Sequence, residues 1–276
     1  MSLFEKGYQN LHTHTTYCDG TLSAEEMIAA ALSKGGGSIG FSEHSFVKFD
    51  LEYSMSLSDT PAYINEVNLL KEKYSEKTDI FLGLEVDYFT EQIPEGLDYI
   101  IGAAHHIEKN GENITIDATP ERLLEARDTH FGGDFYALTE AYFETVSAVP
   151  KKTNADIIAH FDLIKKHNEN GKLFDETHPR YLDAAISAME QILSTCNIFE
   201  ISTGAMFRMG KSEQYPSAFL LKHLKNRGGE ILFSSDSHCG DSLFYKFDDM
   251  QQLARSCGFT HYKRLTADGF VNLKIL

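Results

Sequence analysis

The amino-acid sequence lacks any long apolar run. Its longest segment without Asp, Glu, Lys or Arg extends over 12 residues, Gly7 to Cys18, and is mostly polar. Because a membrane helix needs about 20 apolar residues in succession, we expect neither a bilayer span nor a secretory signal. Cysteine is also scarce, and its 4 residues form no C-x-x-C pair, which is typical of reduced thiols rather than disulfides. These absences together predict a cytoplasmic protein.

Positive charge is in short supply. The 276 residues carry 25 Lys and Arg against 41 Asp and Glu, which gives a net charge of −16. Such a balance repels nucleic-acid backbones and anionic lipid, so neither nucleic acid nor a membrane surface is an expected partner. Hydrophobic residues at 42% and charged residues at 24% are ordinary values for a globular protein. No linker or repeat divides the chain, so residues 1–276 are predicted to form a single domain.

Seven short apolar segments alternate with segments of helical periodicity. The predicted strands are residues 8–14, 38–44, 80–87, 99–106, 155–162, 197–203 and 230–238. This alternation indicates an α/β fold with a parallel sheet and helical crossovers. An open doubly wound sheet would collect ligands near one switch point, whereas here ionisable residues follow almost every strand. The pattern therefore favours a closed barrel with its active site at the carboxyl rim.

Helix start signals lie between these strands. Ser23 and Glu26 form a capping box for a predicted helix over residues 23–34. Cap residues or cap-proline pairs also start helices at Thr60, Thr119 and Asp134, and periodicity predicts others over residues 179–193, 215–227 and 248–257. The helices are long enough to cover the outside of such a barrel.

Histidines gather at the ends of the predicted strands. The first strand ends in His12-Thr13-His14 and the last in Asp236-Ser237-His238, and residues i and i+2 of a strand point to the same face. All but one of the intervening strands also carry a histidine or an acidic residue at or near their end. The candidate metal ligands are His12, His14, Asp19, His44, Glu85, His105, His160, Asp236 and His238. Imidazoles and carboxylates without a thiolate suit Zn²⁺, Mn²⁺ or Fe²⁺ better than Ca²⁺.

These clusters resemble the motifs of the polymerase and histidinol phosphatase (PHP) superfamily, and the resemblance extends from His12 to His238. It implies a distorted (β/α)7 TIM-like barrel that holds three divalent metal ions. By position, the implied ligand sets are His12, His14, Glu85 and Asp236 for one ion, Glu85, His105 and His160 for the second, and Asp19, His44 and His238 for the third.

Secondary motifs resemble those of the histidinol-phosphate phosphatases within that superfamily. They lie at residues 41–45, 52–55, 160–163 and 215–217. The resemblance implies hydrolysis of L-histidinol phosphate to L-histidinol and phosphate, a step of histidine biosynthesis. Three carboxylates and three divalent ions would leave a charge of about +3, which could hold a small phosphate monoester while a metal-bridging hydroxide attacks phosphorus.

Basic residues near the rim are expected to bind the phosphate. Arg208 and Lys211 follow the one predicted strand that has no candidate metal ligand. A guanidinium fork can hold two phosphate oxygens, so Arg208 is the stronger candidate of the two. Lys165 is a further basic candidate near the fifth strand.

Acidic and aromatic residues are expected to contact the rest of the substrate. Asp162, two residues beyond His160, is predicted to face the same side as that ligand. There it could protonate the leaving alkoxide or hold the substrate amine, or it could instead support a metal-bound histidine. Glu52 and Tyr53, in the loop of residues 46–58, suit an imidazole and ammonium headgroup.

The sequence leaves three alternative functions. A PHP phosphoesterase for another small phosphate ester would carry similar motifs. A polymerase-associated PHP module is disfavoured by the acidic charge and by the lack of a further domain. A purely structural metal domain predicts that Glu85→Ala unfolds the chain, whereas a catalytic centre predicts lost turnover with the fold retained.

Overall fold

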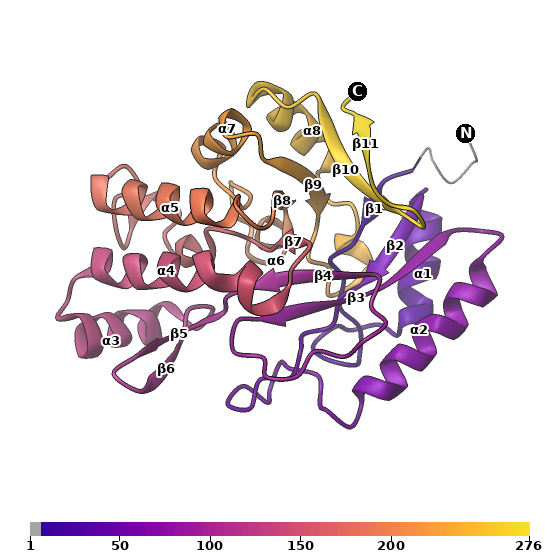
Figure 1. Ribbon diagram of the computed structural model, residues 1–276, viewed down its shortest axis with the longest axis horizontal. Coiled ribbons are helices and arrows are strands. Elements are labelled where there is room, and N and C mark those ends of the chain that lie inside the picture. The colour runs from indigo at the N-terminus through magenta and orange to yellow at the C-terminus, as the bar shows by residue number, and fades with distance from the viewer. Residues whose placement is uncertain (1–6) are drawn as a thin grey trace.

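Parallel strands form the central wall of the protein (Figure 1). The computed structural model describes residues 7–276 and places seven strands in the order β1-β2-β3-β4-β7-β8-β9. Their bounds are β1 Gln9–Asn10, β2 Ser38–Phe41, β3 Asp79–Asp87, β4 Tyr99–Ala103, β7 Ile157–Ile158, β8 Ile198–Ser202 and β9 Glu230–Ser234. Each predicted segment supplies one of them. Most strands end earlier than predicted, so most candidate ligands lie in the loops that directly follow.

The first and last strands of the sheet meet, so the wall is nearly closed. A parallel bridge pairs Thr13 with Ser237. The amide of His14 donates to the Ser237 carbonyl at 2.8 Å, and the Ser237 amide donates to the His12 carbonyl at 3.0 Å. The prediction of a barrel rather than an open doubly wound sheet is confirmed.

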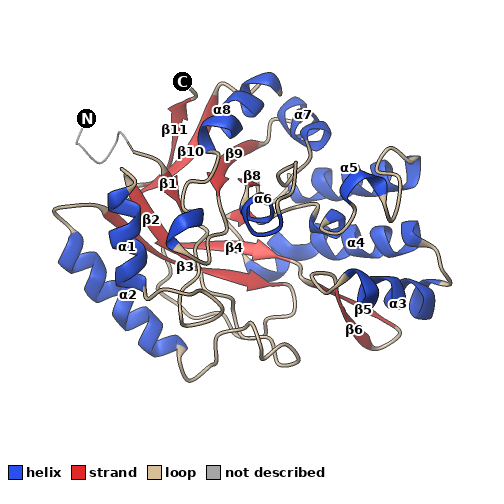
Figure 2. Ribbon diagram, turned by 180° about the vertical axis from the view of Figure 1, so that it is seen from behind, coloured by secondary structure: helices blue, strands red, loops and turns tan. Residues whose placement is uncertain are grey.

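Helices surround this wall in both ribbon views (Figure 1, Figure 2). The helices are α1 Ala24–Ser33, α2 Thr60–Tyr74, α3 Pro120–Phe131, α4 Phe135–Thr153, α5 Pro179–Ile192, α6 Gly204–Met209, α7 Ala218–Asn226 and α8 Phe247–Ser256. The capping box of Ser23 and Glu26 is present at α1, and Thr119 and Asp134 cap α3 and α4 as predicted. Helix α2 differs, because Asp59 occupies its cap position and Thr60 is already helical.

Two antiparallel hairpins add to the predicted elements. One pairs β5 His106–Lys109 with β6 Glu112–Thr115, and the other pairs β10 His261–Thr266 with β11 Gly269–Lys274. In the second hairpin Leu265 donates its amide to Gln9 Oε1 at 2.8 Å, and Gln9 Nε2 donates to the Leu265 carbonyl at 3.0 Å. Because Gln9 begins β1, this hairpin covers the amino end of the barrel, opposite the candidate ligands.

An aromatic ring fills the barrel below those ligands. The buried Tyr99 hydroxyl donates to the carbonyls of Leu11 and Phe41. A Cβ atom at Gly83 would lie 2.2 Å from Tyr99 Cζ, so only glycine leaves room for the ring at this place. The filled interior makes the carboxyl rim the floor of a cavity rather than the mouth of a pore.

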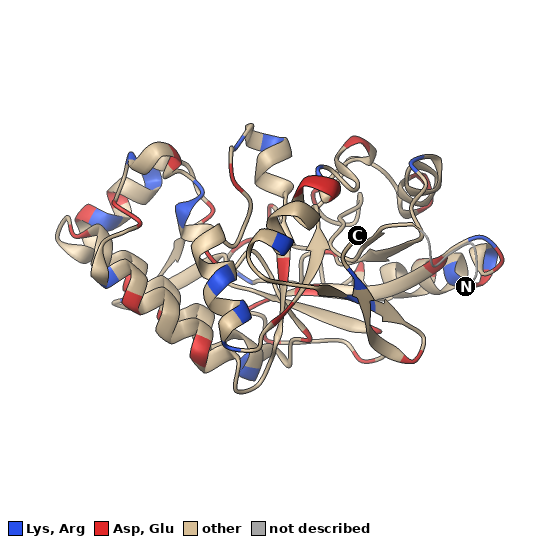
Figure 3. Cartoon of the chain, turned by 90° about the horizontal axis from the view of Figure 1, so that it is seen from above, with Lys and Arg blue, Asp and Glu red and all other residues tan. Residues whose placement is uncertain are grey.

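Charged residues are distributed over many elements of the exterior. Acidic and basic positions are mixed along the outer helices and loops (Figure 3). Within residues 7–276, no helix has the length and apolar character that crossing a membrane requires.

Candidate metal centre

The candidate ligands converge on one cavity at the carboxyl ends of the strands, called here the metal cavity. Its volume is about 850 Å³. Candidates that line it are Asp19, His44, Glu85, His105, His160, Asp236 and His238. The other two, His12 and His14, are completely buried and face Glu85 and Asp236 from below. The structure therefore brings together residues that lie more than 200 positions apart in the chain.

Glu85 at the end of β3 lies at the centre of this group. Both of its carboxylate oxygens face imidazole nitrogens. From Oε2 the distances are 2.8 Å to His44 Nδ1, 3.3 Å to His12 Nε2 and 3.6 Å to His14 Nε2, and from Oε1 they are 3.0 Å to His160 Nε2 and 3.4 Å to His105 Nε2. One carboxylate thus joins ligands from four other strand ends, as expected of a bridging metal ligand.

A second set of contacts surrounds the two remaining acids. Asp236 Oδ1 lies 3.2 Å from His14 Nε2 and 3.5 Å from His12 Nε2. Asp19 Oδ2 lies 3.0 Å from His238 Nε2, and Asp19 Oδ1 lies 3.7 Å from His44 Nε2. Asp236 has a left-handed backbone, with φ at 42°, so the regular alternation predicted for residues 236–238 does not apply to it.

Buried polar atoms without a partner show that the group fits metal ions. His12 Nε2, His14 Nε2 and Glu85 Oε2 are buried, and none has a hydrogen-bond partner. Such atoms are costly unless something coordinates them. Within the described chain, sets of ligand atoms lying within 4.8 Å of one another include His14, Asp19, His44 and His238, then His12, His14 and Asp236, and also His44, Glu85 and His105. These nitrogen and oxygen donors suit Zn²⁺, Mn²⁺ or Fe²⁺.

The charges of the centre shift the titration of its histidines. Burial lowers the pKa of His12, but the carboxylates of Glu200, Glu85 and Asp236 outweigh burial and raise that pKa well above its usual value. At His105 burial also lowers the pKa, but the carboxylates of Glu85 and Asp87 outweigh burial and raise that pKa well above its usual value. Burial and the neighbouring imidazoles lower the pKa of His14 to about 3.

These shifts predict that metal binding releases protons. His12 and His105 stay protonated to a higher pH than an ordinary histidine. A metal ion must therefore displace the protons on the nitrogens that coordinate it. His14 is already neutral and has none to lose. We therefore expect metal affinity to rise with pH, and calorimetric titrations of metal-free protein in buffers of different ionisation enthalpy should reveal the released protons. A binding heat that is the same in every buffer would contradict this.

Two of the candidate histidine ligands contact an acid or a thiol through the ring nitrogen Nδ1. His105 Nδ1 lies 3.2 Å from Asp87 Oδ2, which supports the view that Asp87 orients a ligand. His14 Nδ1 lies 3.4 Å from Cys18 Sγ, and that thiol donates to Glu43 Oε2 at 2.7 Å. Burial followed by the charge of Glu43 raises the pKa of Cys18 well above its usual value, so this cysteine is not an activated nucleophile.

Sequence reasoning missed Glu200 in the middle of β8. It is completely buried and contacts both His12 and the backbone of His160. The signal was an acidic residue inside the otherwise apolar segment Ile198 to Ile201, because such a residue is almost never fully buried without a partner.

Three of the predicted substrate residues line the metal cavity. Arg208 Nη2 donates to Asp236 Oδ2 at 2.6 Å, and Arg208 Nη1 contacts His238 Nδ1 at 2.9 Å. Its side chain is 38% exposed, so the guanidinium is accessible from the cavity. Glu52 and Tyr53 line the same cavity from their loop. Arg208, Glu52 and Tyr53 therefore remain candidates for substrate contacts.

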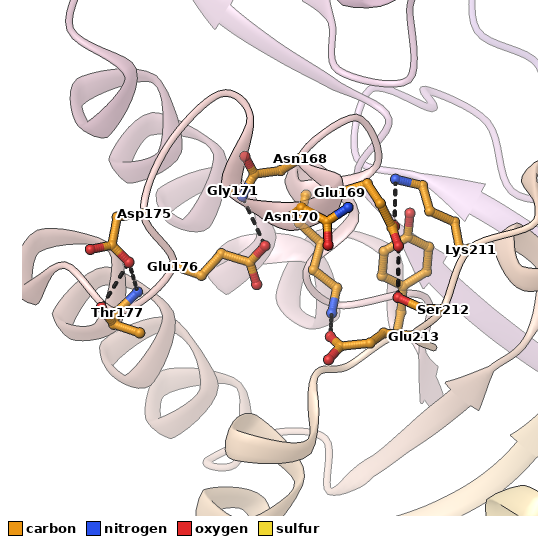
Figure 4. A pocket seen from close by; sticks show the side chains of 12 residues that line it. Asn168, Glu169, Asn170, Gly171, Asp175, Glu176, Thr177, Lys211, Ser212 and Glu213 are labelled. Atoms are coloured by element: carbon orange, nitrogen blue, oxygen red, sulfur yellow. Dashed lines mark hydrogen bonds and ion pairs between the residues drawn. The ribbon is translucent and has the colours of Figure 1, made fainter.

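The two predicted lysines lie elsewhere, on a second cavity of about 460 Å³ (Figure 4). Lys211 Nζ lies 3.4 Å from Glu169 Oε2, as Figure 4 shows. Lys165 Nζ lies 3.3 Å from Asp162 Oδ2 and 3.4 Å from Glu213 Oε2. Both ammonium groups are thus paired with acids outside the metal cavity, which differs from their predicted role.

Lys166 lines the metal cavity in place of Lys165, and it pairs with Asp117. Successive residues of a 3₁₀ turn point about 120° apart, so neighbouring lysines face different cavities. The sequence offers no means of choosing between them, because the turn at Leu163–Lys165, directly after the predicted strand of residues 155–162, was not predicted.

Asp162 also differs from its prediction. Strand β7 ends at Ile158, and the Leu163 amide already donates to the His160 carbonyl at 2.9 Å. Because the chain turns here, residues i and i+2 no longer share a face. Asp162 is completely buried and accepts from the Ser217 amide at 2.9 Å, and it is not among the residues that line the metal cavity.

Comparison with known proteins places the chain in a family. The PHP domain family matches residues 10–203, which is more than half of the chain. The protein therefore belongs to the PHP domain family. Asp236 and His238 lie beyond the matched segment, although they contact ligands within it.

Curated relatives are similar to the chain in sequence, and solved structures share its fold. A Deinococcus radiodurans protein described as "Probable histidinol-phosphatase" is 28% identical over 266 residues, which cover 91% of this chain and 94% of the relative. A Listeria monocytogenes crystal structure has a TM-score of 0.75 at 20% identity and covers 87% of this chain and 99% of its own. Histidinol phosphate phosphatase from Lactococcus lactis, complexed with zinc, L-histidinol and phosphate, has a TM-score of 0.66 at 19% identity and covers 96% and 99%. The predicted PHP-type barrel is confirmed.

Proposed function

We propose that this protein is a metal-dependent phosphatase that hydrolyses L-histidinol phosphate to L-histidinol and inorganic phosphate, a step of histidine biosynthesis. The observation that carries the proposal is the convergence of imidazoles on both oxygens of Glu85 at the floor of an open cavity. The name of the Deinococcus relative and the ligands of the Lactococcus structure support the substrate.

The nine candidate ligands are proposed to hold three divalent ions, either Zn²⁺, Mn²⁺ or Fe²⁺. Such ions, when bound, supply positive charge to phosphoryl oxygens and acidify the attacking water. The protein contributes the fixed positions of the ligands, because most of them are buried and each strand end is held by the barrel. Rigid placement of this kind reduces the reorganisation needed during the reaction.

Arg208 is proposed to bind the phosphate. A guanidinium has five N–H donors, so it can contact phosphate oxygens while it stays bonded to Asp236. Its attachment to a candidate metal ligand keeps it at the edge of the centre, where the phosphate of a bound substrate would lie.

Other residues that line the cavity suit a cationic headgroup. Asp50, Glu52 and Asp117 line it together with the aromatic rings of Phe49 and Tyr53. Carboxylates there can pair with an ammonium or protonated imidazole, and the rings provide flat apolar contact. A volume of about 850 Å³ is large enough for a small amino-alcohol phosphate.

A comparison of substrates tests the proposal. We expect metal-loaded protein to have a higher kcat/KM for L-histidinol phosphate than for sugar phosphates or nucleotides. A preference for another ester would refute the substrate but not the phosphatase activity. Binding of single-stranded DNA without any monoester turnover would instead indicate a polymerase-associated module.

Replacement of Arg208 by lysine is expected to lower kcat/KM by about 10- to 100-fold, mainly through KM. Hydrogen bonds to charged groups contribute about 1.5–3 kcal/mol, and lysine cannot reproduce the bidentate geometry. Lys211→Ala is the matched control, since Lys211 faces the second cavity and should leave the kinetics unchanged. Equal losses in the two variants would contradict the assignment of Arg208.

A further inference from the structure

Glu200 is a buried acid on the one barrel strand whose end carries no candidate metal ligand. It lies in the middle of β8 with none of its surface exposed. Its side chain nevertheless reaches three other strand ends, those of β1, β7 and β9. The contacts with His12 and His160 connect it to two candidate ligands from different strands.

Both oxygens of Glu200 accept hydrogen bonds. Oε1 accepts from the backbone amide of His160 at 2.7 Å. Oε2 accepts from Ser234 Oγ at 2.8 Å and lies 2.8 Å from His12 Nδ1. A carboxylate can only accept, so Nδ1 of His12 must carry a proton. The lone pair that remains for a metal ion is then the one on Nε2.

The other ring nitrogen of His12, Nε2, faces two of the other candidate metal ligands. His12 Nε2 is buried without a hydrogen-bond partner and lies 3.3 Å from Glu85 Oε2 and 3.5 Å from Asp236 Oδ1. The contact with Glu200 therefore selects the tautomer whose free nitrogen faces the other candidate ligands.

A similar arrangement occurs on the opposite side of the centre. Asp87 Oδ2 accepts from the His105 backbone amide at 2.9 Å and lies 3.2 Å from His105 Nδ1. There one acid holds the ring and the backbone of the same ligand. Glu200 does so for two ligands, since it holds the ring of His12 and the backbone of His160.

We propose that Glu200 is a positioning residue that fixes the metal-binding tautomer of His12 and the placement of His160, and thereby sets the metal affinity of the centre. This inference rests on the metal centre of the proposed function. It does not depend on the identity of the substrate, because it concerns the binding of metal ions alone.

Glu200→Gln tests the role with almost no change of shape. If the amide oxygen accepts from His160, the NH₂ group faces His12 Nδ1 and moves the imidazole proton to Nε2. If the amide is reversed, its NH₂ group faces the His160 N–H, which leaves a buried donor unsatisfied. Either arrangement damages one ligand, so we expect metal affinity to fall about 10- to 100-fold.

The measurement is a competition titration of metal-free protein with Zn²⁺ and a chromophoric chelator, without substrate. Ser234→Ala is the matched variant, since it removes one donor to Glu200 but leaves the contacts with His12 and His160. Glu176→Gln is the control for the same change outside the metal cavity. Both should bind Zn²⁺ as the unmodified protein does.

The outcomes separate the possible failures. Unchanged affinity in Glu200→Gln, or an equal loss in Ser234→Ala, would overturn the positioning role and reduce Glu200 to a link between strands. An unmodified protein that binds none of Zn²⁺, Mn²⁺ and Fe²⁺ would instead refute the proposed function.

A second measurement decides the matter if Glu200→Gln does not fold. Nitrogen-proton correlation spectra of the Zn²⁺-loaded, unmodified protein should show a proton on His12 Nδ1 and none on Nε2. The signal can be assigned by its loss in His12→Gln. A proton found on Nε2 would overturn the inference.

Discussion

Glu85→Gln is expected to lower kcat/KM by about 10³-fold or more, which corresponds to about 4 kcal/mol of lost transition-state stabilisation. The change removes a negative charge and replaces one of two acceptor oxygens by a donor. Each oxygen of Glu85 faces imidazole nitrogens, at distances from 2.8 Å upward, so an NH₂ group on either side would confront candidate ligands. Metal content, measured by elemental analysis, should fall together with the activity.

The fold of this variant distinguishes a catalytic centre from a structural one. Circular dichroism and thermal unfolding of Glu85→Gln should show a folded protein, because the substitution keeps the shape of the side chain and leaves the apolar residues of the barrel core unchanged. Glu176→Gln makes the same substitution beside the second cavity and should retain full activity. An unfolded Glu85→Gln would favour the structural alternative.

Removal of the metal ions is expected to abolish activity and to lower the melting temperature. Without ions, the buried His12 Nε2, His14 Nε2 and Glu85 Oε2 have no hydrogen-bond partner. A ligand present at 100 times its Kd stabilises the folded state by about 2.7 kcal/mol, so its loss should lower the Tm by about 5 °C or more.

The test is dialysis against a chelator, followed by assay and by addition of Zn²⁺, Mn²⁺ or Fe²⁺ separately. Activity should return with at least one of these ions, and the ion that restores the highest kcat/KM identifies the preferred metal. Protein dialysed against the same buffer without chelator serves as the control. Full activity at a metal content below detection would exclude a metal-dependent mechanism.

The strand pattern was sufficient to predict the barrel and to predict that the candidate ligands lie close together. Parallel strands in a closed wall have their carboxyl ends at one rim, so a histidine after each strand can only lie near the others. This holds even where the strands end early, as for His160 after Ile158. The position along the barrel, rather than strict alternation, decides where such a ligand lies.

The prediction that Asp162 faces the metal site relied on alternation beyond the strand end, and the structure differs from it. Asp162 and Lys165 both follow His160, but the chain turns there, and their side chains pair with each other instead of facing the metal cavity. The direction of a side chain in a turn depends on local backbone angles that periodicity does not describe.

Glu200 illustrates a different limit. A sequence pattern identifies ligands by their place at strand ends, whereas Glu200 acts from the middle of a strand and through other residues. Its apolar neighbours in the sequence indicate burial, but its contacts with His12 and His160 are visible only in the structure. Residues that support a site are therefore harder to predict than residues that form it.

The hairpin of β10 and β11 has a practical consequence for work with fragments of this protein. A recombinant fragment trimmed to the matched segment, residues 10–203, would lose β9, Asp236 and the hairpin that covers the amino end of the barrel. Strands β1 and β8 would then have unpaired edges, which invite aggregation. Fusion tags are better attached after Leu276, which is 87% exposed and follows the hairpin at the end of the barrel away from the ligands.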